Sequence, residues 1–527
     1  MGDRAGGWVI LAKTYDVIVV GAGSAGCALT HRLVNAGVRV LLLEAGGPDD
    51  KPQIHSEQLL DTLSLWAPGE LDWGYVSEPQ RGMGGRTIAV MRGKVWGGCS
   101  SVNAMVHVRG NRRDYDRWAA AGNPGWAYAD VLPLFRRMED FDGGASDYRG
   151  SGGPLSVIVH DTPTPVSERL FPAAAANGFD DLGSGFDYNA ERQEGAVFYY
   201  QATKTRHHRR ASTAEAYLRP ILDSPQLALE SYAVVSRVLI EAGRAVGVEY
   251  MQDGHAARAR ADHEVVICAG TFESPKLLML SGVGGAAELG EHGLKVLVDA
   301  PAVGKGLQDH LILGVGYMNR QPQPELPTLI AETGLFLRTA GAAADGPPDI
   351  QIKFGGLKFV PPDKDRDGPG FTFAPVLIQP RSSGAIRLRS ADPSVTALLD
   401  PDYLSAQADV DALVAAVELV RELAHDRALD DFRGEELAPG ASVTGRQALA
   451  DYVRAYSGTL WHPTGTCRMA PGPDGVVDAQ LRVKGVARLR VADASIMPLI
   501  VAGNTNAATI MIGERAADLV TAALGAA

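Results

Sequence analysis

The clearest pattern of apolar and polar positions lies near the N-terminus, where two short apolar runs flank a glycine-rich segment. Residues 15–20 are β-branched and nearly all apolar, which predicts a strand buried on both faces. Residues 27–35 carry leucines four positions apart and are followed by Gly37, which predicts a helix that ends there. The apolar residues 38–43 run into Glu44 and predict a second strand. The chain therefore opens with a strand–helix–strand unit.

Glycine and proline are frequent up to about residue 215, and a series of strand patterns follows. Ser212 and Glu215 fit a capping box, which predicts a helix through Leu218. The other expected elements are strands at 227–232, 234–241, 245–251 and 264–268, a helix with Ser274 as N-cap and Pro275 as first residue, strands at 350–354, 372–379 and 385–389, a helix at about 407–425, a strand at 489–492 and a helix from Asn506 to about 519. The apolar strands between Gly and Pro turns in 350–389 predict an antiparallel sheet.

Length and charge narrow the class of protein. The 527 residues include 46% hydrophobic and 21% charged residues, and the formal net charge is −12. A chain of this size buries a core without help from disulfides or metals, and its hydrophobic content excludes pervasive disorder. The acidic balance argues against a nucleic-acid partner or an anionic membrane surface. No apolar run approaches the roughly 20 residues of a membrane-spanning helix.

The cysteines and the N-terminal residues indicate in which cellular compartment we expect the protein. Cys27, Cys99, Cys268 and Cys467 lack metal-ligand spacing, so we expect four reduced thiols and no metal. The apolar stretch 8–12 is too short for the core of a signal peptide. We therefore expect a cytoplasmic protein.

The glycines after the first strand predict a dinucleotide site. Gly21 permits a tight turn, Gly23 lets the backbone approach a pyrophosphate, and Gly26 allows close packing of helix and strand. Glu44 ends the second strand, where a carboxylate can hold a ribose diol. This acid disfavours the 2′-phosphate of NADP but does not separate NAD from FAD. The alternative is a glycine-rich turn without a ligand.

Further motifs add candidate chemistry. In residues 93–105 a Gly-Gly-Cys-Ser-Ser run offers N–H groups and hydroxyls beside a flat ligand or diphosphate, and Asn103 could donate to a ring carbonyl. Pro463 holds the backbone of His462 extended, so its ring is presented from a fixed position. Asn506 starts the last helix, whose N-terminal end favours negative charge, for example a reduced flavin ring. Taken singly, each motif also fits a structural loop or a structural histidine.

Taken in order over about residues 15–520, these motifs resemble those of the glucose–methanol–choline (GMC) oxidoreductases. Residues 93–105 and 269–284 correspond to the two signature patterns of that family. Residues 303–310 also match, although Lys305 and Gly306 stand where members more often have Glu and Asn. The resemblance is nearest to bacterial members similar to choline dehydrogenase or hydroxymethylfurfural oxidase.

This resemblance implies an α/β fold with a Rossmann-like FAD-binding domain and an α+β substrate-binding domain on an antiparallel or mixed sheet. The implied division places 13–160, 220–315 and 455–527 in the FAD-binding domain, and 161–219 and 316–454 in the substrate-binding domain. FAD, not NAD, is the implied cofactor. Some members attach FAD through a histidine where this chain has Val102, so we expect non-covalent FAD.

The family's site residues carry over by position. His462 falls on the active-site base and Asn506 on the second catalytic position. The implied cofactor contacts are Gly21, Gly23, Ser24, Ala25, Gly26, Glu44, Ala45, Val95, Gly98, Ser100, Asn103, Ala104, Met105, Val106, Val235, Ala269, Gly270, Trp461, Asp493, Ala494, Asn504 and Thr505. Trp461 and Phe354 are the expected walls of the substrate pocket.

The expected reaction is the oxidation of a primary alcohol to the aldehyde. His462 would take the hydroxyl proton, Asn506 would donate to the same oxygen, and the hydride would pass to FAD. Oxygen or another acceptor would reoxidise the flavin. The alternatives are a hydroxynitrile-lyase-like protein that keeps FAD without net redox, and an NAD-linked dehydrogenase, against which the later motifs argue. The alcohol and the oligomeric state stay open.

One basic stretch in this acidic chain has two interpretations. Residues 204–210 read Lys-Thr-Arg-His-His-Arg-Arg. The first interpretation is a solvated loop before the capped helix, and the second is a positive rim near the substrate entrance that favours anionic or polar substrates.

Overall fold

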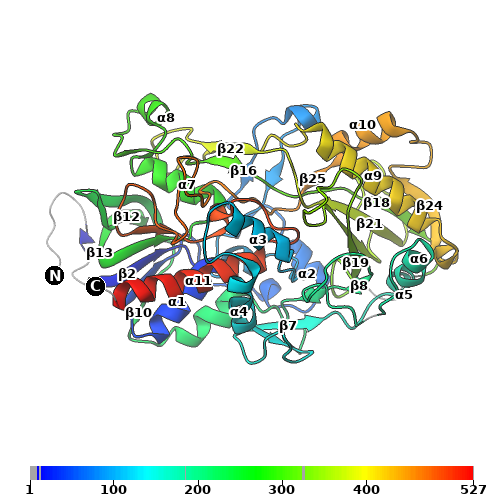
Figure 1. The fold of residues 1–527 in the computed structure, drawn as a ribbon, viewed down its shortest axis with the longest axis horizontal. Coiled ribbons are helices and arrows are strands. Elements are labelled where there is room, and N and C mark those ends of the chain that lie inside the picture. The colour runs from blue at the N-terminus through cyan, green and yellow to red at the C-terminus, as the bar shows by residue number, and fades with distance from the viewer. Residues whose placement is uncertain (1–8, 11–13, 184, 323–326, 526–527) are drawn as a thin grey trace.

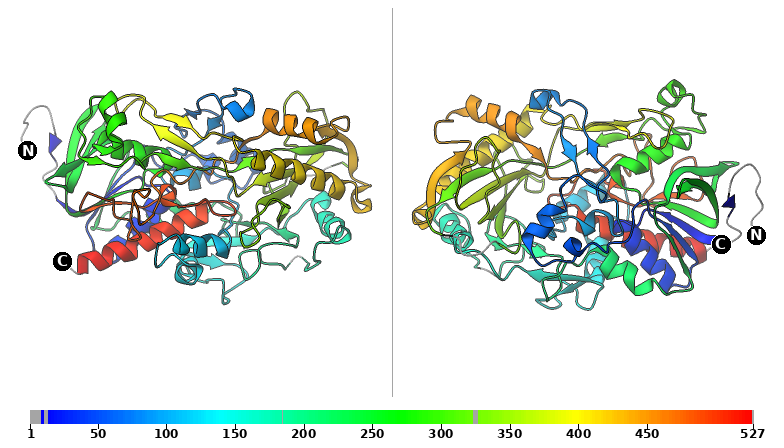
Figure 2. Two further views of the ribbon diagram at one scale, coloured as in Figure 1. Left: turned by 45° about the horizontal axis from the view of Figure 1, so that its top comes forward. Right: turned by 180° about the vertical axis from the view of Figure 1, so that it is seen from behind.

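Two sheets organise the molecule, one toward each end of its long axis (Figure 1). The computed structural model describes residues 9–10, 14–183, 185–322 and 327–525. The first and last elements of the described chain lie at the first sheet, whereas the second sheet is built mainly from the middle of the chain (Figures 1 and 2).

The first sheet grows from the predicted strand–helix–strand unit. Its strands are β1 (Val9–Ile10), β2 (Tyr15–Val20), β3 (Val40–Leu43), β10 (Leu227–Glu230), β11 (Val234–Glu241), β12 (Arg244–Gln252), β13 (His255–Ile267) and β26 (Leu489–Val491). In the order β10-β3-β2-β13-β26 all neighbours are parallel. The first half of β13 pairs antiparallel with β12, which pairs with β11. One long strand therefore carries both the parallel sheet and an antiparallel extension.

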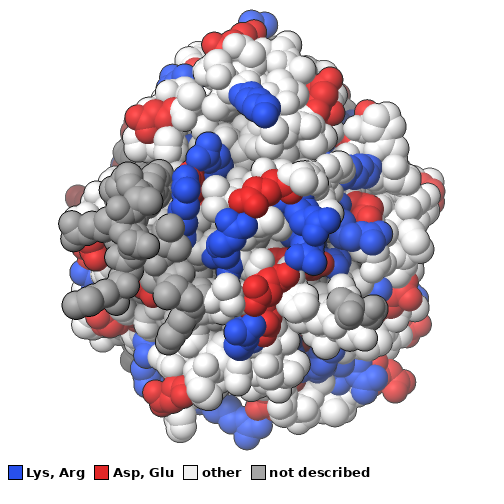
Figure 3. Space-filling view, turned by 90° about the vertical axis from the view of Figure 1, so that its left-hand side faces the viewer, with Lys and Arg blue, Asp and Glu red and all other residues white. Residues whose placement is uncertain are grey.

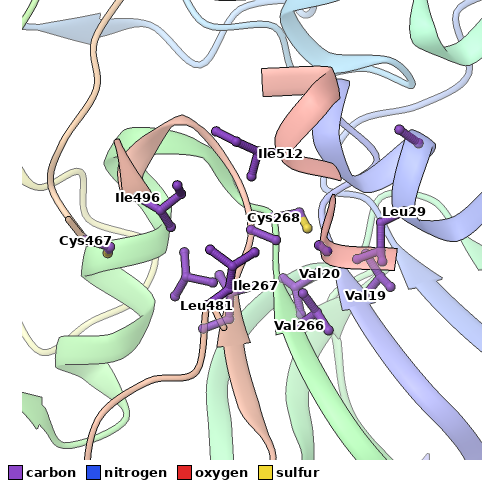
Figure 4. Packing of buried hydrophobic residues seen from close by; sticks show 14 of the residues in the cluster. Val19, Val20, Leu29, Val266, Ile267, Cys268, Cys467, Leu481, Ile496 and Ile512 are labelled. Atoms are coloured by element: carbon purple, nitrogen blue, oxygen red, sulfur yellow. The ribbon is translucent and has the colours of Figure 1, made fainter. Parts of the chain in front are cut away.

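Two helices from opposite ends of the chain pack against each other beside this sheet. They are α1 (Ser24–Asn35) and α11 (Asn506–Gly525). Figure 4 shows Leu29 of α1 and Ile512 of α11 above Val19 and Val266 of the sheet. A Cβ at Gly513 would lie 2.3 Å from the carbonyl oxygen of Ala25, so the two helices approach closely only because this residue is glycine.

The second sheet is antiparallel. Its strands are β8 (Phe198–Tyr199), β17 (Leu311–Ile312), β18 (Val315–Asn319), β19 (Thr333–Leu337), β20 (Ile350–Gly355), β21 (Gly370–Leu377), β24 (Arg433–Ala438) and β25 (Gly458–Thr459). Helix α9 (Gln407–Ala424) packs on β18, β20 and β21, and α10 (Arg446–Tyr456) packs on α9 (Figure 1). The helices cover one face, so the other face is available to a site.

Shorter elements connect and flank the two sheets. They are η1 (Pro52–Ile54), α2 (Leu59–Ser64), β4 (Tyr75–Val76), η2 (Arg81–Met83), β5 (Ala89–Val90), η3 (Gly98–Ser101), α3 (Arg112–Ala120), α4 (Tyr128–Met138), β6 (Glu139–Phe141), β7 (Leu155–Val159), α5 (Pro165–Glu168), α6 (Leu170–Ala176), β9 (Gln201–Ala202), η4 (Ala214–Leu218), η5 (Arg219–Ile221), α7 (Gly270–Leu280), β14 (Val283–Gly284), α8 (Ala286–Glu291), β15 (Val298–Asp299), β16 (Lys305–Leu307), β22 (Gly384–Arg387), β23 (Leu398–Asp400), η6 (Arg427–Leu429) and η7 (Ala494–Ile496). None of the described helices is long and apolar enough to cross a membrane.

The predicted fold class is confirmed, and most predicted elements appear within a few residues of their expected bounds. The expected start of α7 is wrong. This helix begins at Gly270, and Pro275 lies inside it. Pro275 cannot donate to the carbonyl of Thr271, and the hydroxyl of Thr466 donates to that oxygen instead, at 2.6 Å. Ser274 does not cap the helix, because its hydroxyl donates to Asp493.

Two further expectations about local structure need refinement. The Ser212 hydroxyl accepts from the N–H of Glu215 as a cap would, but the turn that follows is a π-helix, η4.

The division into two domains stays a prediction. The strands β17 and β25, whose residues were expected in the FAD-binding domain, pair with each other and join the second sheet.

The basic stretch 204–210 is not simply a solvated loop. Arg210 is only 2% exposed, and its guanidinium donates to the carbonyls of Ile54, Ser100 and Asn103. Lys204 is also buried, whereas Arg206 and Arg209 are exposed. The stretch therefore anchors a loop beside the Gly-Gly-Cys-Ser-Ser run.

Charged side chains of both signs share the surface, and the cysteines are unpaired. Figure 3 shows lysine and arginine side chains interspersed with acidic ones on the end face of the molecule where the first sheet lies. All four cysteines are free, and Cys27, Cys268 and Cys467 are buried.

A buried carboxylate on α11 gives a test of how the helices are held together. Glu514 is fully buried and pairs with Arg32 of α1 at 2.9 Å and with Arg137 of α4 at 2.8 Å. The Glu514→Gln variant should lose about 2 kcal/mol of unfolding free energy in urea, because both arginines lose their anionic partner. The Asp478→Asn variant breaks the exposed pair with Arg482 and should lose less than about 0.5 kcal/mol. Equal losses in both variants would contradict this role of Glu514.

Candidate active site

A single long cavity joins the two sheets. At one end it is lined by the carboxyl ends of β2 and β3 and the start of α1, and at the other by residues of β20 and β21. Ligands of open parallel sheets bind at this edge, beyond the carboxyl ends of the strands. The cavity is therefore placed to hold a dinucleotide at one end and a second molecule under the antiparallel sheet.

The glycines of the fingerprint show three different constraints. Gly21 has a φ of +103°, and a Cβ there would lie 2.5 Å from the carbonyl oxygen of Cys268. A Cβ on Gly26 would lie 1.9 Å from the carbonyl oxygen of Gly21, so this residue allows the helix to pack on the turn. A Cβ on Gly23 would meet no protein atom within 4 Å. Gly23 lines the cavity, and the space that a side chain would take there is not filled by another part of the protein. Glycine at this position therefore leaves room for a ligand.

Glu44 is held in place by the backbone around it. Its carboxylate accepts from the N–H of Ala22 at 2.8 Å and from the N–H of Gly46 at 2.7 Å. The side chain is nearly buried but lines the cavity, and burial raises the pKa of Glu44 to about 7. An oriented carboxylate bonded to the backbone of the glycine-rich loop fits a ribose diol. The loop and Glu44 together therefore fit the dinucleotide part of FAD.

Most of the expected cofactor residues meet at this cavity. Those that line it are Gly21, Gly23, Ser24, Ala25, Glu44, Ala45, Gly98, Asn103, Ala104, Met105, Val106, Val235, Ala269, Gly270, Trp461, Asp493, Ala494, Asn504 and Thr505. Gly26, Val95 and Ser100 do not line it. Val95 is fully buried in an apolar cluster, and the Ser100 hydroxyl bonds to the Gly97 carbonyl and the Thr213 hydroxyl. These three residues shape the loops around the cavity.

The backbone around His462 is strongly constrained. Trp461 has a φ of +61°, which is unusual for a bulky residue. Its N–H donates to the Thr459 hydroxyl at 2.7 Å, and its carbonyl accepts from the Arg92 guanidinium at 2.9 Å. Pro463 follows directly. The strained turn and its two anchors set the direction in which the His462 side chain leaves the backbone.

One buried carboxylate joins the segments that carry the two histidines of the site. Asp309 Oδ1 accepts from the backbone N–H groups of His462 and His310, each at 2.8 Å. Its Oδ2 accepts from the hydroxyls of Thr459 and Tyr403, each at 2.5 Å. Burial raises the pKa of Asp309, and the hydroxyl bonds oppose this shift. Asp309 thus fixes both histidine backbones.

The hydrogen bonds of the His462 ring define its tautomer. Its Nδ1 lies 3.0 Å from Nδ1 of His310, and its Nε2 lies 3.3 Å from the amide nitrogen of Asn504. The amide nitrogen is a donor, so Nε2 must accept and the ring proton sits on Nδ1. Burial lowers the pKa of His462 well below its usual range, with further lowering from His310, Lys353 and Arg92. His462 is therefore a neutral imidazole whose Nε2 lone pair is directed toward the Asn504 amide at the cavity.

A lysine that the sequence did not single out orients the Asn504 amide. Lys353 Nζ donates to Asn504 Oδ1 at 3.3 Å, which leaves the amide nitrogen facing His462. Strand β20 was predicted, and its alternation could have placed Lys353 opposite Phe354. His310 lay in a matched motif, but no role had been assigned to it.

Asn506, the expected partner of His462, lines the same cavity but bonds to a different residue. Asn506 Oδ1 accepts from the Ser24 hydroxyl at 2.7 Å, where the start of α11 meets the start of α1. The amide next to His462 belongs to Asn504, two residues earlier. The sequence pattern Asn-Thr-Asn could not distinguish them, because the distinction depends on how the start of α11 packs against α1.

The two expected walls of the substrate pocket differ in their exposure to the cavity. Trp461 is partly exposed and meets Trp66 edge-to-face, with ring centroids 5.2 Å apart. Phe354 lies at the edge of the cavity, but it is 1% exposed and its ring packs on Phe373 on the side of the sheet covered by α9. Leu357, Phe359 and Leu460 complete an apolar wall.

Comparison with known proteins gives the same assignment along the whole chain. Family models described as GMC oxidoreductase match residues 15–312 and 380–513. The chain is 40% identical to the mitochondrial choline dehydrogenase of Mus musculus, with 96% of this chain and 89% of the relative covered. It is 38% identical to an oxygen-dependent choline dehydrogenase of Brucella anthropi, with 95% of each chain covered.

A solved structure shows the same fold. The crystal structure of pyridoxine 4-oxidase from Mesorbium loti has a TM-score of 0.88 and 31% identity, and the match covers 97% of this chain and 99% of that one. The resemblance stated from the motifs is confirmed: this chain belongs to the GMC oxidoreductase family.

Proposed function

We propose that this protein oxidises an alcohol to the carbonyl compound with FAD as cofactor. The observation that carries the proposal is the neutral His462, whose unprotonated Nε2 accepts from the amide of Asn504 at the cavity. Relatives named choline dehydrogenase and a neighbour named pyridoxine 4-oxidase support an alcohol as the substrate class. A primary alcohol and an aldehyde product stay our prediction.

Non-covalent binding of FAD is part of the proposal. Val102, which stands where some family members have the histidine that carries FAD, is an aliphatic residue in an apolar cluster. It offers no nucleophile for attachment. The glycine-rich turn and Glu44 supply the contacts that hold the dinucleotide without a covalent bond.

When bound, FAD supplies the hydride acceptor. The chain's own residues prepare the alcohol. His462 Nε2 takes the hydroxyl proton, while the Asn504 amide donates to the same oxygen and holds the carbinol carbon in place. The Nδ1–H of His462 stays bonded to His310, which keeps the ring from rotating as it gains charge. The apolar wall excludes water, so the alcohol oxygen finds no competing proton donor.

The alternatives have less support. No relative or neighbour reported above is named as a lyase, and the family match extends through the late motifs that an NAD-linked dehydrogenase lacks. Oxygen or another acceptor completes the cycle in our proposal. A cytoplasmic location stays a prediction.

The base is tested with a single substitution. The His462→Ala variant should retain FAD but lose about 10³-fold in the rate at which an alcohol bleaches the flavin, because general-base catalysis contributes about that much. The His425→Ala variant removes an exposed histidine of the same protein and should keep the wild-type rate. Rapid anaerobic mixing measures both. Near-normal bleaching by His462→Ala would refute the role of the base.

The same reaction gives a dependence on pH. Because the pKa of His462 is lowered, the imidazole stays neutral through the range where an ordinary histidine titrates. The rate of flavin bleaching should therefore be flat from pH 9 down to about 6 and fall only below that, as Nε2 gains a proton. A rate that drops by half near pH 6.5 would show that His462 has an unshifted pKa.

The second catalytic position is tested by comparing two asparagines. The Asn504→Ala variant should keep FAD and lose about 10² in bleaching rate, because the donor to the alcohol oxygen is removed. The Asn506→Ala variant removes the bond to Ser24 and should change FAD affinity more than the bleaching rate of the FAD-loaded protein. The reverse pattern would restore Asn506 as the partner of His462.

The dinucleotide site is tested at Gly23. The Gly23→Ala variant places a methyl group where no protein atom lies within 4 Å, so its apo form should be as stable as the wild type. Its affinity for FAD, measured by fluorescence titration, should fall at least tenfold. Gly290→Ala is the matched control, because its methyl group also meets nothing and lies far from the cavity. Unchanged FAD affinity in Gly23→Ala would contradict a role for Gly23 in binding the dinucleotide.

A further inference from the structure

A buried lysine lies in the substrate part of the cavity without an acidic partner. Lys353 is 7% exposed, sits on β20 and lines the cavity. Its Nζ donates to Asn504 Oδ1 at 3.3 Å and lies 4.8 Å from the centre of the Tyr200 ring. Within the described residues no carboxylate pairs with it, whereas Lys358, which follows β20 and does not line the cavity, pairs with Asp365 at 2.7 Å.

The register of β20 directs this charge toward the substrate. Ile350, Ile352 and Phe354 belong to the apolar core under α9, so the alternate residue Lys353 lies on the opposite face of the strand. The walls nearby are apolar, among them Ile312, Leu357 and Leu460. Lys353 is therefore the charged group of an otherwise apolar pocket wall.

The carboxylates that line the cavity are already engaged. Glu44 accepts from backbone N–H groups, Glu273 accepts from Tyr75 and Lys276, and Asp493 accepts from Ser274 and Gly270. Each lies beside the glycine-rich loop or α7, at the cofactor end. Lys353 thus has no anionic partner from the chain itself.

An ammonium group in this position is costly unless a ligand pairs with it. Burial lowers the pKa of Lys353 to about 7. The ionisable groups around it are His462 and His310 on one side and the phenol of Tyr200 on the other, and neither histidine is charged at neutral pH because both pKa values are lowered. An anion brought by the substrate would restore the charge and remove the cost.

We propose that the substrate is an alcohol that carries a carboxylate, and that Lys353 binds this carboxylate. The inference rests on the proposed alcohol oxidation. One amide separates Nζ from His462 Nε2, so the carboxylate lies within a few bonds of the carbinol carbon and the rest of the substrate is apolar. The same charge repels a quaternary ammonium group, so choline, named for the mammalian and bacterial relatives, is a poor substrate here.

A ligand that cannot be oxidised separates this inference from the proposed reaction. Phenylacetate and phenylacetamide have the same shape but differ in charge, and neither carries a hydroxyl. Calorimetry on the FAD-loaded protein should show that phenylacetate binds at least tenfold more tightly. The Lys353→Met variant should lose this preference, and the Lys358→Met variant, which removes a charge bonded to Asp365, should keep it.

A second variant separates anion binding from the positioning of Asn504. Lys353→Gln retains a donor that can reach Asn504 Oδ1 but has no charge. It should lose the preference for phenylacetate, and its loss of bleaching rate with benzyl alcohol should be smaller than that of Lys353→Met, which has no donor for Asn504. In the wild type this preference should also decline as the pH rises from 6 to 9, because Lys353 loses its proton over this range.

Oxidisable pairs complete the test. Glycolate and 3-hydroxypropanoate should bleach the flavin at lower concentrations than their amides, and choline should be the least effective. Equal affinity for phenylacetate and phenylacetamide in the wild type, or binding of neither while benzyl alcohol binds, would overturn the role of Lys353. A strong preference for phenylacetate without bleaching by any alcohol would leave this anion site standing and refute the proposed reaction.

Discussion

The site depends on the hydrogen bonds that converge on the Asp309 carboxylate. It accepts from the backbones of two histidine segments and from two hydroxyls, and it is buried. It fixes the backbone N–H of His462 directly after the strained turn at Trp461, and the bonds of that turn to Thr459 and Arg92 fix its other side. Strand β17 begins two residues after Asp309, and its partner β25 ends at Thr459, whose hydroxyl donates to this carboxylate, so the second sheet and the His462 segment meet at the same contact. The chemistry of the site is thus a consequence of how the two chain segments are joined.

The two ends of the cavity reflect two kinds of sheet. Parallel strands present a glycine-rich turn and an acidic residue at their carboxyl ends, which suits a dinucleotide. The antiparallel sheet alternates faces, so one side packs under α9 and the other can carry an isolated polar residue into an apolar pocket. Lys353 and Asn504 meet where these two architectures touch. In our proposal, substrate selection and proton transfer are therefore coupled through the amide group of Asn504.

Much of the fold and part of the candidate site could be predicted from short patterns of neighbouring residues in the sequence. Neighbouring residues alone predict the strand–helix–strand start, the glycine-rich turn, and the positions of Glu44 at the strand end and His462 before a proline. The structure has each of them at the expected place. The failures depend on long-range contacts. Pro275 is tolerated inside α7 because a threonine almost 200 residues away bonds to the freed carbonyl. Arg210 is buried because its guanidinium donates hydrogen bonds to the backbone carbonyls of Ser100 and Asn103, more than 100 residues earlier in the chain. The sequence also could not show which asparagine amide lies next to the His462 ring, because only the packing of α11 on α1 bonds Asn506 to Ser24 and leaves Asn504 beside the ring.

The state of the His462 ring tests this account most directly. Histidine labelled with ¹⁵N in the FAD-loaded protein, with the His462→Ala variant to assign the signal, reports which ring nitrogen carries the proton. The account predicts a neutral ring at pH 7 with the proton on Nδ1 and a bare Nε2. A charged ring at pH 7, or a neutral ring with the proton on Nε2, would contradict it, because His462 could then not accept the proton of an alcohol held by Asn504.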